Sequence, residues 1–256
     1  MPSRYDRHLG KALSVLLAPI PETGRTFGAR RRIRLADLDP HGRVRLDAVA
    51  RLLQDIAIDD VDETGWGAPE HLWFVRTMRL DVLRPLVGDR TVELVTWCSG
   101  VGTLAAGRRW SVTGDAGGRI EVDSVWIHLD RNGVPSRIEE FGVYAGAADG
   151  RRVSTRAALP EPRAPVRRLP WPLRATDIDL HGHVNNAVYW QAVEQLLIGN
   201  GPDLRMPLLA RIEYREPIDL DERVELAVGA APGELHVAFL AGDRVKAVAL
   251  AERFAP

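Results

Sequence analysis

Residues 175–186 of the chain read "ATDIDLHGHVNN", and residues 35–46 read "LADLDPHGRVRL". Asp177 lies 140 positions after Asp37, and at this interval the two stretches share several residues. The other matched pairs are Asp39 with Asp179, His41 with His181, Gly42 with Gly182 and Val44 with Val184. The repeated phrase indicates two equivalent domains that pack like the subunits of a dimer but belong to one chain.

A helical pattern follows each copy of the phrase. After the second copy, apolar residues recur at steps of three and four positions, namely Val188, Tyr189, Ala192, Val193, Leu196 and Leu197. We expect Asn185 or Asn186 to cap the start of this helix and residues 199–201, Gly-Asn-Gly, to end it. After the first copy we expect Asp47 to cap a helix that ends near Gly65. Apolar faces this broad predict one buried helix in each half.

The similarity between the halves continues beyond the helices. Residues 83–94, "LRPLVGDRTVEL", match residues 215–226, "REPIDLDERVEL", with Pro85 aligned to Pro217. Segments rich in β-forming residues, separated by turn residues, cover 74–83, 91–98, 107–113 and 120–129 in the first half, and 208–216, 223–230, 234–240 and 245–251 in the second. Each half therefore reads as a strand, a helix and four further strands. This pattern predicts an α+β fold in which an antiparallel sheet wraps around one long helix.

The composition excludes several classes of protein. About 45% of the 256 residues are hydrophobic, which is enough for a packed core. The formal net charge of −1 argues against a nucleic-acid partner, and no apolar run reaches the roughly eighteen residues of a membrane span. The single cysteine, Cys98, forms no internal disulfide, so we expect a reducing, cytoplasmic location. Residues 7–24 predict a short amphipathic helix rather than a cleaved signal peptide.

The two copies of the phrase differ in their polar residues. The second copy has His183 where the first has Arg43, and two asparagines, Asn185 and Asn186, where the first has arginine and leucine. With two aspartates and a second histidine, His181, these residues form a dense polar cluster just before a buried helix. Such a cluster is costly unless its groups are used in a reaction or hydrogen-bonded.

The cluster suits hydrolysis. Asp179 can orient a water molecule as general base, or attack a reactive acyl carbon itself. Backbone N–H groups at the start of the helix can hold a developing oxyanion, and a histidine can position the water or assist the leaving group. We expect Asp177 to serve only the turn.

Two other interpretations of the cluster stay open. The aspartates can form Asx turns while the histidines are ordinary surface groups, an interpretation that applies most directly to His181. A metal site built on the His-x-His pair of His181 and His183 lacks a third ligand at a suitable spacing, so we expect neither a metal nor another cofactor.

Taken together, these motifs resemble the acyl-acyl carrier protein thioesterases of plants and bacteria. The phrase that carries the resemblance is "DxDxxGHVNN" followed by a buried helix. Further matching stretches are "WFVRTMRLDVLRPLVGDRTVELVTW" (73–97), "GRRW" (107–110), "DSVWIHLD" (123–130) and Tyr214-Arg215-Glu216. They occur in the expected order over about nine-tenths of the chain.

The resemblance implies a double hotdog, an α+β fold with two antiparallel sheets that each wrap around a long central helix. It implies an N-terminal hotdog domain at residues 1–150, with a degenerate site and a role in acyl-chain binding. A Pro/Arg-rich linker at residues 151–170 and a catalytic C-terminal hotdog domain at residues 171–256 follow. The implied activity is hydrolysis of the thioester between a fatty acyl chain and acyl carrier protein (ACP), which releases free fatty acid.

The resemblance also implies which residues act. The family's catalytic aspartate and histidine fall on Asp179 and His183, and its asparagine position holds His181, a departure that makes this hydrogen bond depend on pH. The family's later glutamate falls on Glu216 if one residue is deleted. The cysteine that follows it is Pro217 here, so the implied mechanism is led by aspartate without a thiol.

Three further residues are expected to contact the substrate. Asn185 and Asn186 belong to the matched phrase, and Asp39 is the first-half counterpart of the catalytic aspartate. Because Arg43 replaces the histidine in that half, we expect Asp39 to have at most a residual role at the domain interface.

The distribution of arginine suggests a partner. Residues 25–34 contain five arginines and no acid, and residues 151–174 contain seven arginines and one acid. ACP is acidic and carries its arm on a phosphate, which arginine binds well. A solvated linker explains the second cluster equally well. Two alternative functions also remain: an acyl-CoA thioesterase, and a non-catalytic acyl-binding protein.

Overall fold

The computed structural model describes residues 17–65, 72–139, 141–156, 159–163 and 166–253. The first half contains β1 (Thr26–Arg32), α2 (Leu46–Thr64), β2 (Leu72–Arg84), β3 (Thr91–Val101), β4 (Ala105–Gly114) and β5 (Arg119–Leu129). The second half contains β6 (Arg167–Trp171), α4 (Asn186–Asn200), β7 (Leu208–Tyr214), β8 (Val224–Ala231), β9 (Glu234–Ala241) and β10 (Arg244–Arg253). Each half thus has the predicted order of a strand, a helix and four strands. Most of the expected amphipathic helix at 7–24 lies outside the described residues.

Four short helices complete the described structure. The 3₁₀ turns η1 (Leu35–Asp37) and η3 (Ala175–Asp177) precede the two long helices, and η2 (Gly142–Tyr144) with α3 (Ala145–Ala148) follows the first sheet. Among the described residues, none of the helices has the length and apolar character needed to cross a bilayer.

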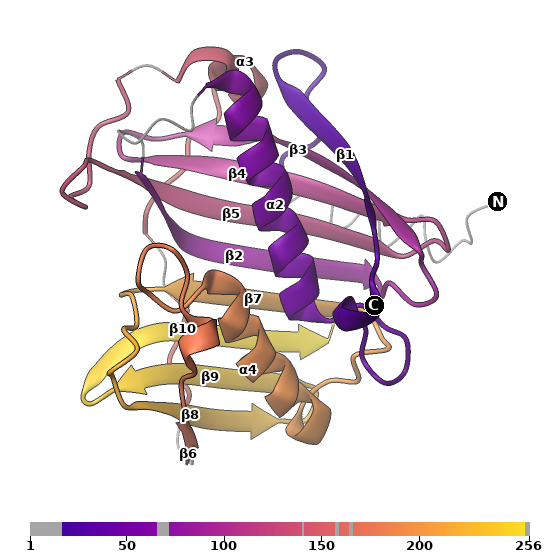
Figure 1. The fold of residues 1–256 in the computed structure, drawn as a ribbon, viewed down its shortest axis with the longest axis vertical. Helices are drawn as coiled ribbons and strands as arrows, with labels where there is room; N and C mark the ends of the chain where they lie inside the picture. The colour runs from indigo at the N-terminus through magenta and orange to yellow at the C-terminus, as the bar shows by residue number, and fades with distance from the viewer. Residues whose placement is uncertain (1–16, 66–71, 140, 157–158, 164–165, 254–256) are drawn as a thin grey trace.

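The strands form one antiparallel sheet of ten, in the order β1-β3-β4-β5-β2-β7-β10-β9-β8-β6 (Figure 1). The expected sheets of the two halves are therefore joined edge to edge, through β2 and β7. At their junction Arg79 pairs with Arg211, 132 positions later, the same interval that separates Pro85 from Pro217. Because equivalent residues face each other there, a pseudo-two-fold axis passes through this pair and relates the halves.

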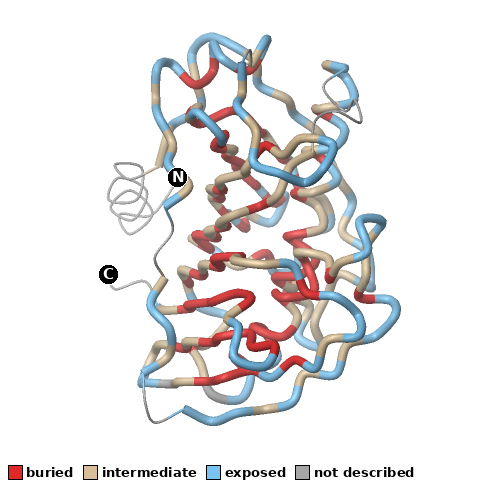
Figure 2. Tube along the Cα trace, turned by 90° about the vertical axis from the view of Figure 1, so that its left-hand side faces the viewer, coloured by how far each residue is buried: buried red, intermediate tan, exposed pale blue. Residues whose placement is uncertain are grey.

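The two long helices lie on the same face of the sheet (Figure 1). Their inward residues form one core with the strands, including Leu53 and Ile56 of α2 and Trp190 and Val193 of α4, all at most 1% exposed. Figure 2 shows this buried layer between the helices and the sheet. The helices α2 and α4 also contact each other, and the Gln191 side chain of α4 donates a hydrogen bond to Asp47 of α2, so the helices meet where the two halves meet.

The residues that cap the long helices agree with those predicted from the sequence, with one exception. Asn185 caps α4 by accepting a hydrogen bond from the Ala187 N–H at 2.9 Å, and Gly65 ends α2 with φ at 72°. The prediction that Asp47 caps α2 is wrong, because the cap position is Arg45. Asp47 lies inside the helix, buried, and pairs with Arg45 and Arg51 instead.

The segment between the halves is shorter than the expected linker. Strand β6 begins at Arg167 and pairs with β8, so it occupies the end of the stretch 151–170 that composition suggested was a linker. Within that stretch, Leu159 packs on Ala238 and Val248, which alternate with core residues and therefore lie on the sheet face opposite the helices. The pairing of β6 with β8 gives hydrogen-bond partners to its backbone N–H and C=O groups. The proline and arginine content of the segment does not indicate this pairing.

Candidate active site

The second copy of the repeated phrase folds into a tight turn ahead of α4. The Asp179 N–H donates to the carbonyl oxygen of His183 at 2.9 Å, and Gly182 adopts a φ of 83°, a conformation that favours glycine. Asp177 is buried and anchors the turn, because its carboxylate accepts the N–H of Arg174 at 2.9 Å and its carbonyl accepts the N–H of Asn185.

Asp179 has one carboxylate oxygen engaged and one available. Its Oδ1 accepts the N–H of His181 at 2.9 Å, which fixes the side chain. No group among the described residues donates a hydrogen bond to its Oδ2. A partly buried carboxylate oxygen of this kind can accept a proton from water.

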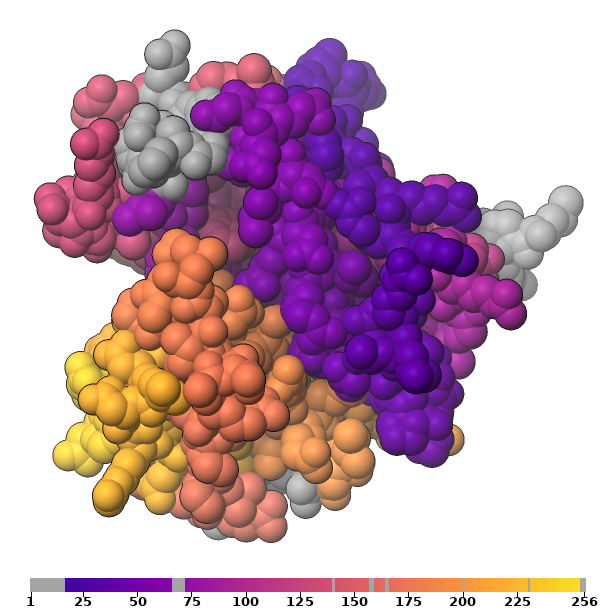
Figure 3. Space-filling model, viewed as in Figure 1, coloured from indigo at the N-terminus to yellow at the C-terminus, as the bar shows by residue number. Residues whose placement is uncertain are grey.

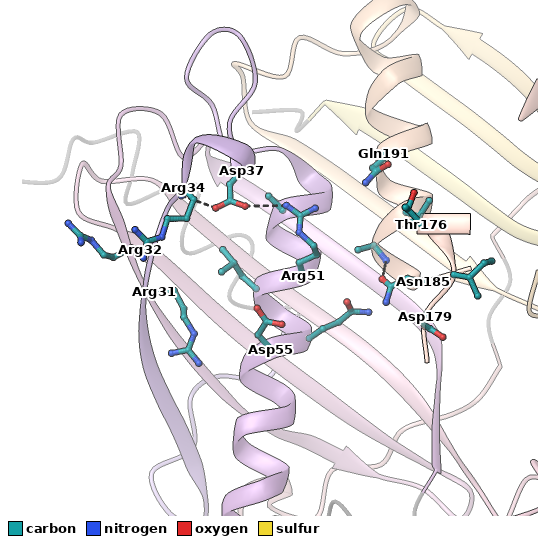
Figure 4. A pocket seen from close by; sticks show the side chains of 16 residues that line it. Arg31, Arg32, Arg34, Asp37, Arg51, Asp55, Thr176, Asp179, Asn185 and Gln191 are labelled. Carbon is teal, nitrogen blue, oxygen red and sulfur yellow. Dashed lines mark hydrogen bonds and ion pairs between the residues drawn. The ribbon is translucent and has the colours of Figure 1, made fainter. Parts of the chain in front are cut away.

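The Asp179 carboxylate lines a groove of about 680 Å³ between the two halves. This volume is typical of small-molecule sites. Figure 4 shows the groove, with Arg31, Arg32 and Arg34 on the side of β1, Arg51 and Asp55 on α2, and Thr176, Asp179, Asn185 and Gln191 on the side of the second half. Leu52 and Gln54 of α2 and Val188 of α4 also line it. In Figure 3 the violet residues of α2 meet the orange residues of the second half across the middle of the molecule.

The start of α4 supplies positive potential to this groove. The amino end of a helix carries N–H groups without helical partners and the positive end of the helix dipole. Here the Asn185 side chain accepts the Ala187 N–H, while the Asn186 N–H donates to no acceptor among the described residues. The carbonyl of Asn186 accepts the Tyr214 hydroxyl at 3.1 Å, which holds this residue in place.

The other predicted residues lie outside the groove lining. His183 places its Nδ1 2.7 Å from Oδ1 of Asp219, and both side chains are about half exposed. His181 is exposed. Glu216 pairs with Arg244 at 3.2 Å and with Lys246 at 3.6 Å. The structure therefore brings Asp179 and Asn185 together in the groove, and it gives His183 a partner, Asp219, that the sequence did not indicate.

The equivalent place in the first half is filled. Arg43 is buried and pairs with Asp39 through Nε at 3.1 Å and with Glu194 of α4 through Nη2 at 2.6 Å. Partial burial acts to raise the pKa of Asp39, but the N–H groups of Arg43 and His41 and the Arg43 charge lower it overall. Glu194 also accepts the N–H of Leu46 at 2.6 Å.

Cys98 has the properties of an inert core residue. Its side chain is buried beside Trp97 and Tyr144, and burial raises the pKa of its thiol to about 11. The thiolate, which is the nucleophilic form, is therefore scarce at neutral pH.

Among the described residues there is no group of three histidine, cysteine, aspartate or glutamate side chains arranged to hold a metal ion.

Comparison with known proteins gives a family for this architecture. A family model described as the acyl-ACP thioesterase N-terminal domain matches residues 24–140, and one described as the C-terminal domain matches residues 162–243. The chain belongs to the acyl-ACP thioesterase family. Family membership makes it a thioester hydrolase, and it confirms the resemblance drawn from the repeated phrase.

Relatives match almost the whole chain of this acyl-ACP thioesterase family member. An uncharacterized protein of Mycobacterium tuberculosis strain H37Rv is 30% identical over 249 residues, which are 96% of this chain and 99% of the relative. The oleoyl-acyl carrier protein thioesterase 1 of Arabidopsis thaliana chloroplasts is 22% identical over 82% of this chain and 65% of its own length.

Solved structures of similar proteins share the fold. A putative oleoyl thioesterase from Lactobacillus plantarum superimposes with a TM-score of 0.75 at 17% identity, covering 93% of this chain and all of that one. The 12:0-ACP thioesterase from Umbellularia californica gives a TM-score of 0.69 at 19% identity over 90% of this chain and 97% of that one. These neighbours confirm the predicted double hotdog fold of the family member.

Proposed function

We propose that the protein hydrolyses fatty acyl-ACP thioesters to free fatty acid and holo-ACP, with Asp179 as the residue that activates water. One observation carries the proposal: Asp179 lines the groove between the halves, beside the start of α4, and only one of its carboxylate oxygens accepts a hydrogen bond from the described residues. The Arabidopsis and Umbellularia proteins, whose names specify acyl-ACP substrates, support the choice of carrier.

The proposed reaction begins when the thioester carbonyl carbon lies beside Asp179. The carboxylate removes one proton from a water molecule as the water oxygen bonds to that carbon. Negative charge develops on the carbonyl oxygen, and the Asn186 N–H and the positive end of α4 stabilise it. The C–S bond then breaks, the carbonyl re-forms, and the sulfur leaves as a thiol with the proton that Asp179 had taken. Asp179 returns to its carboxylate form.

Direct attack by Asp179 on the acyl carbon is the competing route. It would give a mixed anhydride between the acyl group and Asp179, which water then cleaves. A single turnover in ¹⁸O-labelled water detects this route when water attacks the Asp179 carbonyl of the anhydride, because label then stays in the protein. General-base catalysis labels only the released acid.

In the proposed mechanism His183 assists departure of the sulfur. Its Nδ1 is held by Asp219, so the Nε2 is the ring atom available to a substrate at the mouth of the groove. We propose a supporting role for Glu216: it pairs with Lys246, which also pairs with Glu222, and Glu222 accepts the Asp219 N–H at 3.0 Å. His181 would add a hydrogen bond at the exposed rim.

We further propose that the arginines at the rim of the groove attract the carrier. Arg31, Arg32 and Arg34 line it on the side of β1. An acidic protein with a phosphate-linked arm would be steered to such a rim, and its phosphate would accept hydrogen bonds from guanidinium groups. An acyl-CoA substrate offers phosphates too, so acyl-CoA hydrolysis is the second candidate, and acyl binding without hydrolysis is the third.

The test is a thiol-release assay over a range of acyl lengths on both carriers. Asp179→Asn should lower kcat by about 10²–10⁴-fold, because it removes the general base while keeping the shape of the side chain. Its matched control is Asp39→Asn, the same change at the equivalent position, which should retain most of the activity. Equal losses in the two variants would contradict the assignment to Asp179. Tight acyl binding without thiol release from either carrier would support the non-catalytic alternative instead.

A further inference from the structure

Gln54 of α2 is the counterpart of Glu194 of α4. Each residue lies eight positions after the first residue of its helix, Leu46 or Asn186, and the pair are 140 positions apart, as the repeat requires. The pseudo-two-fold axis therefore relates these two side chains. What Glu194 does at one helix start indicates what Gln54 can reach at the other.

Glu194 reaches the first residue of the opposite helix. Its Oε2 accepts the Leu46 N–H at 2.6 Å, and its Oε1 pairs with Arg43 at 2.6 Å, so both carboxylate oxygens are engaged by groups of the first half. By the pseudo-symmetry, Gln54 faces the start of α4 from across the domain junction. Gln54 lines the same groove as Asp179 and Asn185, and its amide has no hydrogen-bond partner in the part of the chain that the structure describes.

We propose that Gln54 is a catalytic residue contributed by the first half: its side-chain N–H binds the thioester carbonyl oxygen beside the Asn186 N–H. This inference rests on the hydrolysis proposed above and adds a second donor for the oxygen that becomes charged. A neutral amide suits the task, because it donates a hydrogen bond and leaves the helix N–H open to the substrate. A carboxylate at this position would accept the N–H itself, as Glu194 does at Leu46.

The first variant for the test is Gln54→Leu, which keeps the size of the side chain and removes the amide. We expect kcat to fall by about 10²-fold with KM changed less than threefold, since the lost interaction forms mainly in the transition state. The melting temperature should not fall, because no protein group loses a partner. Gln195→Leu, at an exposed glutamine of α4, is the matched control and should keep the wild-type kcat and stability.

The second variant, Gln54→Glu, separates catalysis from stability. The new carboxylate should accept the Asn186 N–H, so the melting temperature should rise while kcat falls about tenfold or more. The mirror change, Glu194→Gln, should lower the melting temperature and leave kcat within threefold, because it breaks the pair with Arg43 away from the groove. A merely structural role for Gln54 would move activity and stability in the same direction.

The outcomes separate this inference from the proposed function. If Asp179→Asn is inactive while Gln54→Leu and Gln54→Glu both keep kcat within threefold of the wild type, the role of Gln54 is overturned and the hydrolysis stands. A loss confined to KM, or a loss of kcat matched by a loss of stability in both Gln54 variants, overturns it as well. A wild-type protein that releases no thiol from any acyl carrier overturns both proposals.

Discussion

Asp123 of β5 is a partly buried carboxyl group whose ionisation should affect stability. Burial raises its pKa to about 6, in spite of the opposing charges of Arg109 and Arg79, which pair with it across the sheet. The folded state therefore holds the proton more tightly than the unfolded state, in which the pKa is about 4. The resulting stabilisation is present below about pH 4 and is lost as the pH rises through 6.

Asp123→Asn should remove this dependence. The free energy of unfolding of the variant minus that of the wild type should increase by on the order of 2 kcal/mol from pH 4 to pH 8. The reason is that asparagine stays uncharged, like the protonated carboxyl, at every pH. Urea denaturation at a series of pH values measures the difference. Asp243→Asn, in the exposed turn between β9 and β10, is the control. Parallel stability curves for Asp123→Asn and the wild type would contradict the assignment.

At the scale of single residues, the sequence identified the polar residues of the turn before α4 more readily than the residues that these side chains contact. Asp179 and Asn185 could be singled out because they stand in a repeated phrase before a helical pattern. Asp219 could not, because it lies 36 positions after His183 and the two residues meet only through an isolated β-bridge in the folded chain. The correspondence of Gln54 and Glu194 could have been predicted from the sequence, because extending the repeat alignment into the two helices pairs these positions.

Helix α2 ends at a residue whose backbone demands glycine. Gly65 has φ at 72°, and a Cβ placed there would meet no atom within 4 Å. The cost of a side chain at this position is therefore conformational rather than steric. The same glycine was the signal by which the end of α2 could be predicted.

Gly65→Ala should lower the free energy of unfolding by about 1 kcal/mol. Gly28→Ala is the matched control: Gly28 lies in β1 at an ordinary φ, and its added Cβ would come no closer than 3.8 Å to the Leu94 carbonyl oxygen. That variant should be unchanged or slightly more stable, because alanine has less freedom to lose on folding. Equal effects at both positions, measured by denaturant unfolding, would show that left-handed geometry is not the cause.

Most helices and strands could be predicted from the sequence, but the residues at which they begin and end could not always be predicted. Strands β2–β5 and β7–β10 lie close to the segments expected from β-rich patterns and turn residues. The start of α2 was missed because its orphan N–H at Leu46 is satisfied by Glu194, 148 positions away, and not by a local capping residue. The sequence analysis gave no position for the first strand of the second half, β6, because its composition resembles that of a linker and only its pairing with β8 makes it a strand.

On the scale of the whole molecule, the two halves share their sheet and several buried contacts. The β2–β7 pairing runs from Thr77 to Val82, Arg76 pairs with Glu213 at 3.0 Å, and Arg43 pairs with Glu194. Neither half can unfold alone without exposing a sheet edge and leaving buried charges unpaired.

The protein should therefore unfold as one cooperative unit. Hydrogen exchange measured by mass spectrometry should give the same opening free energy for core peptides of β4 and of β9, and calorimetry should show one transition. Glu194→Ala should lower that single transition, because the buried Arg43 keeps only Asp39 as a charged partner and the Leu46 N–H loses its acceptor. Two separate transitions, or different opening free energies in the two halves, would mean that the halves fold independently.

The arrangement of the halves has an evolutionary consequence that follows from the unlike pair at positions 54 and 194. In a homodimer built from one gene copy, any side chain that sealed one cleft would seal its twin, so every substitution would be tested twice. Joining both copies in a single polypeptide lifts that constraint. Substitutions at one cleft could therefore introduce a buried ion pair that rigidifies the molecule, while the other cleft stayed accessible to a ligand.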